Sequence, residues 1–194
     1  MGKIVITKQN NRLLLTHFDE KQPVLIETAP LLSQEGILGN IYLARVKDVV
    51  SGLRGAFLSV SGEDTVYLPL KENNKFLCAN REFSEGEYIR QGDEIVVQIA
   101  GEALKTKQPT ASEKLELTGQ YCVCSFFGHG IRYSRKLSKD KIDFLSQSIK
   151  EAFIEGRKQY QFTIRTNTES LTDPAPLIKE MRMFIHIFDT IRDT

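Results

Sequence analysis

The 194-residue sequence has no tryptophan, only three cysteines and three histidines, and a formal net charge of +1. So small a charge gives no overall electrostatic argument for a nucleic-acid partner. No run of about 18 apolar residues occurs, and no charged segment followed by an apolar one opens the chain, so neither a membrane span nor a secretory signal is expected. The residues that are present, 41% hydrophobic and 26% charged, are typical of a soluble globular protein.

The three cysteines do not have the spacing of a metal site. Cys122 and Cys124 are two residues apart in YCVCSFF, so on a strand they share one face. No second pair of cysteines or histidines matches them as the other half of a four-ligand zinc site. We therefore expect no metal and no other cofactor in this chain, and reduced cysteines that act as small apolar residues in a cytoplasmic protein.

Hydrophobic periodicity divides the chain into three groups of elements. Three short strands separated by turn residues come first: KIVITK, RLLLTHF and PVLIET. Four strand-like runs within residues 36–109 then indicate a small β-barrel, with a long charged loop before the fourth run. The last group combines further strands with two helices, for which Ser138 and Asp173 are the expected N-terminal caps.

The outer groups need each other, because three short strands cannot bury a face alone and the C-terminal strands need sheet partners. The sequence therefore predicts an α+β fold. A five-stranded barrel of the OB type, residues 36–109, is inserted into a split α/β subdomain formed by residues 1–35 and 110–194.

Five short segments follow one another along the chain: GNIYLARVKDVVSGLRGAFLSV, TVYLPLKE, LELTGQYCV, SRKL and IRT. In this order and spacing they resemble the N-terminal half of the ribonuclease E/G family, and the resemblance covers nearly the whole chain. It implies that residues 36–109 form an S1-type RNA-binding barrel. The split subdomain around the barrel would then be the family's ribonuclease-H-like and 5′-sensor region.

Phe57 and Tyr67 lie at the same phase of two consecutive predicted strands. Exposed aromatic side chains on adjacent strands of an OB barrel form a platform on which RNA bases stack. Alternation alone leaves open a second interpretation, in which both rings lie in the barrel core. The resemblance implies the first, because the family's stacking aromatics fall at these positions and its RNA-contacting lysine aligns with Lys107.

The segment QFTIRTNTES begins as a strand and ends in an arginine and small polar residues. A guanidinium can hold phosphate oxygens through two parallel hydrogen bonds. The resemblance implies a pocket for the 5′-monophosphate of RNA, formed by Gly119, Val123, Arg135, Arg165 and Thr166. The family commonly has Ala and then Gly or Glu after the Arg-Thr pair, where this chain has Asn167 and Thr168, so an ordinary strand end remains the alternative.

The expected function is binding of single-stranded RNA with recognition of a 5′-monophosphate end, in RNA processing or decay. The resemblance implies a Mg²⁺-dependent endoribonuclease whose catalytic domain lies beyond Thr194, and the sequence has no Ser/His/Asp set or HExxH motif. The chain should therefore not cleave RNA alone. We expect no membrane partner, and a homo-oligomer formed through regions outside this sequence stays open. The alternatives are an S1-type module without end sensing and a protein-interaction scaffold that binds no RNA.

Overall fold

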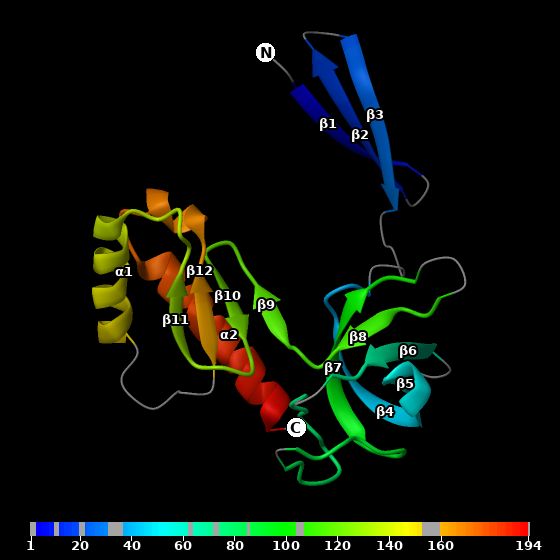
Figure 1. Cartoon of the computed structure of the whole chain (residues 1–194). Coiled ribbons are helices and arrows are strands. Elements are labelled where there is room, and N and C mark those ends of the chain that lie inside the picture. Colours follow the sequence, from blue (N-terminus) through cyan, green and yellow to red (C-terminus); the bar gives the residue numbers. More distant parts are fainter. Residues whose placement is uncertain are drawn as a thin grey trace. The chain divides into compact units, whose positions relative to one another are not determined.

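The structure, a computed structural model, describes residues 3–9, 12–19, 22–30, 37–61, 64–71, 74–84, 86–103, 107–152 and 160–193. The chain divides into two compact units, Met1–Ile37 and Leu38–Thr194 (Figure 1). The predicted turn at Asn10 and Asn11, the polar segment 32–36 and Phe153 lie outside the described residues.

The N-terminal unit is the predicted meander. Its strands are β1 (Lys3–Gln9), β2 (Arg12–Asp19) and β3 (Gln22–Pro30), and they pair antiparallel in the order β1-β2-β3. Five of its apolar side chains are more than half exposed: Ile4, Ile6, Val24, Leu25 and Ile26. The pairing of this meander with the C-terminal part in one split subdomain stays a prediction.

The second unit begins with the closed five-stranded barrel that the sequence predicts. Its strands are β4 (Ile41–Val50), β5 (Gly55–Ser61), β6 (Asp64–Pro69), β7 (Glu94–Gly101) and β8 (Thr110–Ser112), in the order β4-β5-β6-β8-β7. The short 3₁₀ helix η1 (Ser51–Leu53) joins β4 to β5. The fifth strand, β8, begins directly after residue 109, where the sequence places the end of the barrel domain. Alternate residues of β5 and β6 fill the interior: Ala56, Leu58, Val66 and Leu68.

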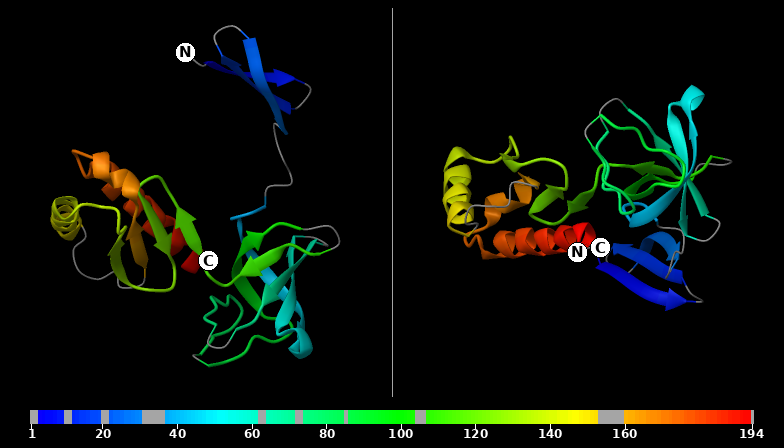
Figure 2. Two further views of the ribbon diagram at one scale, coloured as in Figure 1. Left: turned by 45° about the horizontal axis from the view of Figure 1, so that its top comes forward. Right: turned by 90° about the horizontal axis from the view of Figure 1, so that it is seen from below.

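A mixed four-stranded sheet follows the barrel. Its strands are β9 (Glu116–Thr118), β10 (Cys122–Ser125), β11 (Gly130–Tyr133) and β12 (Gln161–Ile164), in the order β11-β12-β10-β9. Helix α1 (Lys139–Ala152) connects β11 to β12 across a gap in the described residues. The 3₁₀ helix η2 (Thr166–Ser170) and helix α2 (Ala175–Arg192) come last, and α2 runs along one face of the sheet (Figure 2).

Both helices begin where the sequence predicts. The hydroxyl of Ser138 accepts a hydrogen bond from the backbone N–H of Lys141, and the Asp173 carboxylate accepts one from Ala175. The apolar stripe of α2 packs on the sheet because its members recur at helical spacing. Its buried residues are Leu177, Met181, Phe184, Ile185 and Phe188.

Cys122 and Cys124 are fully buried against this helix and act as apolar core residues. Burial raises the pKa of both thiols, to about 12 for Cys124, so neither forms a reactive thiolate at neutral pH. In the part of the chain that the structure describes, no three metal-binding side chains gather at one point. None of the helices described there has the length and apolar character needed to cross a bilayer.

Candidate nucleic-acid interface

Phe57 and Tyr67 form a pair on the outer face of the barrel. They stand directly opposite each other on β5 and β6, with ring centroids 5.6 Å apart and ring planes inclined at 56°. Both are half-buried, whereas the residues on either side of each are buried: Ala56 and Leu58 beside Phe57, and Val66 and Leu68 beside Tyr67. Because successive side chains of a strand point to opposite faces, the interpretation that both rings lie in the barrel core is wrong.

Two contacts position the hydroxyl end of the Tyr67 ring. Its hydroxyl donates to the Leu53 carbonyl at 2.9 Å. The ring lies so close over Gly55 that a methyl group at that position would overlap it. Glycine is therefore required at residue 55 for this ring position, and the pair presents a fixed aromatic surface.

Lys107 belongs to the segment that runs beside Tyr67. The Tyr67 N–H donates to the Pro109 carbonyl at 2.9 Å, and β8 pairs with β6 through Thr110. Lys107 lies two residues before Pro109 and its side chain is exposed. The chain thus brings a cation to the segment beside Tyr67, and the RNA contact of Lys107 stays a prediction.

A second cluster forms at one edge of the four-stranded sheet. β11 and β12 are parallel, with Tyr133 opposite Ile164, so the segments that follow these strands leave the sheet at the same edge. β10 runs antiparallel to β12 and starts at that edge, because Cys122 is opposite Ile164. The edge therefore gathers residues 119–121, 134–136 and 165–168.

Arg165 and Thr166 lie at this edge beside Gly119. One guanidinium nitrogen of Arg165 donates to the Gly119 carbonyl, and the Arg165 N–H donates to the Tyr121 carbonyl at 2.8 Å. The Thr166 hydroxyl is hydrogen-bonded to the Ser134 hydroxyl at 2.9 Å. Three segments that are far apart in the sequence thus meet around one arginine, which is half-buried.

The other two residues predicted for this pocket lie further from its centre. Val123 is the second residue of β10 and is half-buried between Thr163 on one neighbouring strand and Thr118 on the other. Arg135 is exposed in the turn directly after Ser134. Val123 therefore contributes backbone close to the edge, and Arg135 contributes positive charge.

Glu180 is the residue of this site that sequence reasoning missed. Its carboxylate accepts hydrogen bonds from three consecutive backbone N–H groups, of Gln120 at 2.7 Å, Tyr121 at 2.9 Å and Cys122 at 2.8 Å. Successive amides that point at one spot form a concave anion site, called a nest. Here an internal carboxylate from α2 occupies the nest, and it packs so closely on Gly119 that any larger residue there would overlap it.

Comparison with known proteins finds similarity to curated ribonucleases. Ribonuclease G of Haemophilus influenzae is 26% identical over 176 residues, which cover 87% of this chain and 35% of that protein. Ribonuclease G of Escherichia coli K12 is 26% identical over 152 residues, with 72% and 30% covered. Ribonuclease E of a Nostoc species is 22% identical over 139 residues, with 71% and 20% covered. These matches support a relationship to the ribonuclease E/G family.

The chain spans about a third, or less, of the length of the curated relatives that it matches. No family model matches it. The similarity is thus distant, and it concerns one region of the longer proteins.

The two residues that depart from the ribonuclease E/G pattern serve the local structure. The Asn167 amide donates to the Gln120 carbonyl at 3.0 Å. Thr168 is fully buried, and its hydroxyl donates to the Arg165 carbonyl at 2.7 Å. Both side chains connect the turn after β12 to the turn before β10.

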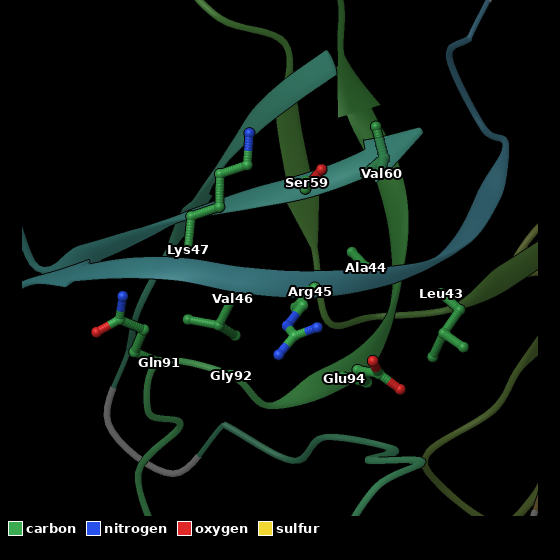
Figure 3. A pocket seen from close by; sticks show the side chains of 10 residues that line it. All are labelled: Leu43, Ala44, Arg45, Val46, Lys47, Ser59, Val60, Gln91, Gly92 and Glu94. Carbon is green, nitrogen blue, oxygen red and sulfur yellow. The ribbon is translucent and has the colours of Figure 1, made fainter. Parts of the chain in front are cut away.

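A hollow of about 520 Å³ lies elsewhere on the barrel of this ribonuclease E/G relative, between β4 and residues 91–94 (Figure 3). Arg45 and Lys47 line it together with Glu94, which stands opposite Arg45 in the strand register. Lys47 donates to the Thr65 hydroxyl at 3.3 Å. None of its described lining residues is aromatic, so this hollow offers no ring on which a base could stack.

Proposed function

We propose that this region binds single-stranded RNA on the outer face of the barrel and recognises a 5′-monophosphate at the sheet edge. It would act in the cytoplasm as the non-catalytic part of an RNA-processing endoribonuclease. Cleavage would belong to a Mg²⁺-dependent domain outside this sequence. The observation that carries the proposal is the outward-facing, fixed aromatic pair Phe57 and Tyr67, in a chain whose relatives are named ribonucleases E and G.

The barrel face has the chemistry of a stacking platform. Two half-buried rings in fixed positions lose little conformational entropy when a base stacks on them. Base–aromatic stacking is worth about 1–3 kcal/mol per base and tolerates any base. An exposed Lys107 beside the pair would add a phosphate contact, so binding should weaken as salt rises.

The sheet edge has the chemistry of a terminal-phosphate pocket. A guanidinium has five N–H donors, and one guanidinium nitrogen of Arg165 contacts the Gly119 carbonyl. We propose that the other donors of Arg165 and the field of Arg135 hold phosphate oxygens, and that the Thr166 hydroxyl joins them while it stays bonded to Ser134. A 5′-hydroxyl end carries no such oxygens and would lose these charge-assisted bonds.

The test is a fluorescence anisotropy titration with two short, 3′-labelled single-stranded RNAs of one sequence. One carries a 5′-monophosphate and the other a 5′-hydroxyl. We expect tighter binding of the monophosphate form, and Arg165→Ala should remove that preference while general affinity remains. Phe57→Ala with Tyr67→Ala should instead weaken binding of both RNAs by about 10-fold or more.

One observation favours a second candidate, an RNA-binding module without end sensing. Thr166 and Asn167 already have internal hydrogen-bond partners, and the nest is already filled by Glu180. Equal wild-type affinity for the two RNAs, with the aromatic variants still weakened, would establish this candidate. Absence of RNA binding even at low salt would leave only a protein-interaction role.

A further inference from the structure

A hollow of about 650 Å³ lies next to the aromatic pair. Its described lining residues come from the β4–β5 connection, the end of β6 and the loop before β7: Val49, Ser51, Arg54, Gly55, Leu70, Lys71, Tyr88 and Ile89. Gly55 also lies against the Tyr67 ring, which a methyl group at Gly55 would overlap. The hollow therefore begins where the aromatic pair ends.

Tyr88 is an exposed aromatic ring on a fixed backbone. Its side chain is 81% exposed, more than that of any other large apolar residue in the described part of the chain. The Arg81 guanidinium donates to the Tyr88 carbonyl at 3.3 Å and to both carboxylate oxygens of the buried Asp93, at 2.8 and 2.9 Å. The same guanidinium reaches Glu87 at 2.7 Å. These contacts fix the loop backbone around Tyr88, while the exposed Tyr88 ring does not pack in the core.

Two cations line the hollow, and none of its described lining residues is acidic. Arg54 has a left-handed backbone, with φ of 47° and ψ of 51°, and is the sole non-glycine residue with positive φ among those described. Its carbonyl accepts the Leu70 N–H at 2.7 Å, which places Arg54 next to Lys71. Such a conformation costs on the order of 1–3 kcal/mol and is found most often at functional sites.

A smaller hollow of about 250 Å³ adjoins the first and shares four of its residues: Leu70, Lys71, Tyr88 and Ile89. Asn74 also lines it. The Asn74 amide nitrogen is buried and has no hydrogen-bond acceptor within the described residues. A buried donor without a partner is costly, and an amide is a good match for the polar edge of a nucleobase.

We propose that these adjoining hollows bind one further nucleotide of single-stranded RNA. Its base stacks on Tyr88 and accepts a hydrogen bond from Asn74, and its phosphate lies between Arg54 and Lys71. This proposal rests on the proposed function, because the nucleotide would be the neighbour of one that stacks on Phe57 and Tyr67. Gly55 lines the larger hollow and lies against the Tyr67 ring, so the two surfaces are continuous. Glu87 lines the smaller hollow but is paired with Arg81, so Arg54 and Lys71 still favour a polyanion over an apolar peptide.

The decisive experiment compares Tyr88→Leu with Tyr88→Phe in the complete 194-residue chain. Affinity is measured by anisotropy for labelled oligouridines of about 4 to 12 nucleotides. We expect wild-type affinity to rise with length, and Tyr88→Leu to lose about 10-fold on the longer RNAs and much less on the shortest. Tyr88→Phe keeps the π-face and should stay within about 2-fold of the wild type.

A second arm tests the charges. Lys71→Ala should lower both the affinity for the longer RNAs and the slope of log affinity against log salt, by about one counterion. The matched control is Lys75→Ala, an exposed lysine of the same segment that lines neither hollow. Circular dichroism confirms that each variant is folded.

The outcomes separate the two proposals. Loss of affinity in Phe57→Ala with Tyr67→Ala, together with wild-type affinity of Tyr88→Leu at every length, would overturn the additional nucleotide site and leave the platform intact. Wild-type behaviour of both sets of variants would overturn the platform as well. Equal losses in Lys71→Ala and Lys75→Ala would show that only nonspecific charge is at work.

Discussion

The barrel face and the sheet edge are both built over a glycine, but they differ in what covers it. At the barrel, the Tyr67 ring covers Gly55 and its faces stay half-exposed. At the edge, the Glu180 carboxylate covers Gly119 and accepts hydrogen bonds from three backbone amides. The barrel face therefore presents a surface on which a ligand can bind without replacing existing hydrogen bonds. The sheet edge is an internally satisfied network, in which a ligand has to share or replace existing hydrogen bonds.

This difference implies a division of roles. Stacking on a fixed ring is tolerant of sequence and supplies affinity. A network with fixed donors rejects ligands that lack matching acceptors, because an unpaired polar group is costly. We therefore expect the barrel to determine how tightly RNA binds and the edge to determine which 5′ end is preferred. Substitutions that uncouple the two properties test this division.

Glu180→Ala should have the largest effect. It leaves three backbone N–H groups without their acceptor. Those of Tyr121 and Cys122 are partly buried, and a buried donor left unsatisfied costs about 1–3 kcal/mol. The loop 119–122 also carries the carbonyl that holds Arg165. Chemical denaturation should therefore show a loss of several kcal/mol, and binding should show no preference between the two 5′ ends.

Glu180→Gln is the matched control for this prediction. It keeps the shape and one acceptor oxygen, so we expect a smaller loss of stability and a partly retained end preference. The aromatic pair is on another element, so general RNA affinity should change little in either variant. Unchanged stability of Glu180→Ala would contradict the role of this carboxylate as the anchor of the loop.

Gly119→Ala should have the next largest effect, because the added methyl group displaces the Glu180 carboxylate from the nest. A glutamate side chain can move aside, so the fold should survive with a loss of about 1–3 kcal/mol. The measurement is the same pair of denaturation and binding curves. If Gly119→Ala and Glu180→Ala act through one contact, the double variant should be no worse than Glu180→Ala alone.

Much of this fold could be predicted from the sequence, because its elements are encoded locally. Strand alternation and helical stripes placed the meander, the barrel and both helices, and Ser138 and Asp173 marked the helix starts. The three-residue strand β8 was too short to show a pattern of its own. Alternation also could not tell the two faces of β5 apart, since Phe57 and Leu58 are both apolar. Only the burial of Leu58 in the closed barrel decides that Phe57 points outward.

The sites were harder to predict, since they depend on contacts between distant segments. The residues after β12 were predicted from a local motif, but their partner Glu180 reaches amides about 60 residues away in the chain. A glutamate beside the apolar stripe of a helix carries no local signal of such a contact. Tyr88 was missed for a related reason, because its loop has no periodicity and its exposure follows from the ion pairs of Arg81.

Low pH should lower the stability of the barrel side in the wild-type protein. Hydrogen bonds from Arg81 hold the pKa of Asp93 below its ordinary value. A carboxylate with a lowered pKa in the folded state stabilises the protein fully above its unfolded pKa of about 3.9, and this contribution is lost as pH falls through the folded pKa. We therefore expect the difference in Tm between the wild type and Arg81→Ala to be constant from pH 7 to 5 and to shrink below about pH 4.

Arg81 also pairs with Glu87 and lowers its pKa, so the comparison with Arg81→Ala reports the contributions of Asp93 and Glu87 together. Asp93 lies on the barrel side, so the acid-dependent part should also appear as faster hydrogen exchange around Tyr88. Exchange of the 119–122 amides is the internal reference. A Tm difference that stays constant down to pH 3 would mean that the Arg81–Asp93 contact does not anchor the loop.

Gly55→Ala should have the smallest effect on stability and a selective effect on binding. The added methyl group would overlap the Tyr67 ring, which must turn away and give up its hydrogen bond to the Leu53 carbonyl. That bond is exposed, so its loss costs at most about 1 kcal/mol. Affinity for single-stranded RNA should fall about 5- to 10-fold for both 5′ ends, because one of the two stacking rings leaves its position.

Gly52→Ala is the matched control, since a methyl group there meets no atom within 4 Å. If Gly55→Ala changed the preference between 5′ ends and left overall affinity intact, the roles proposed for the barrel face and the sheet edge would have to be exchanged.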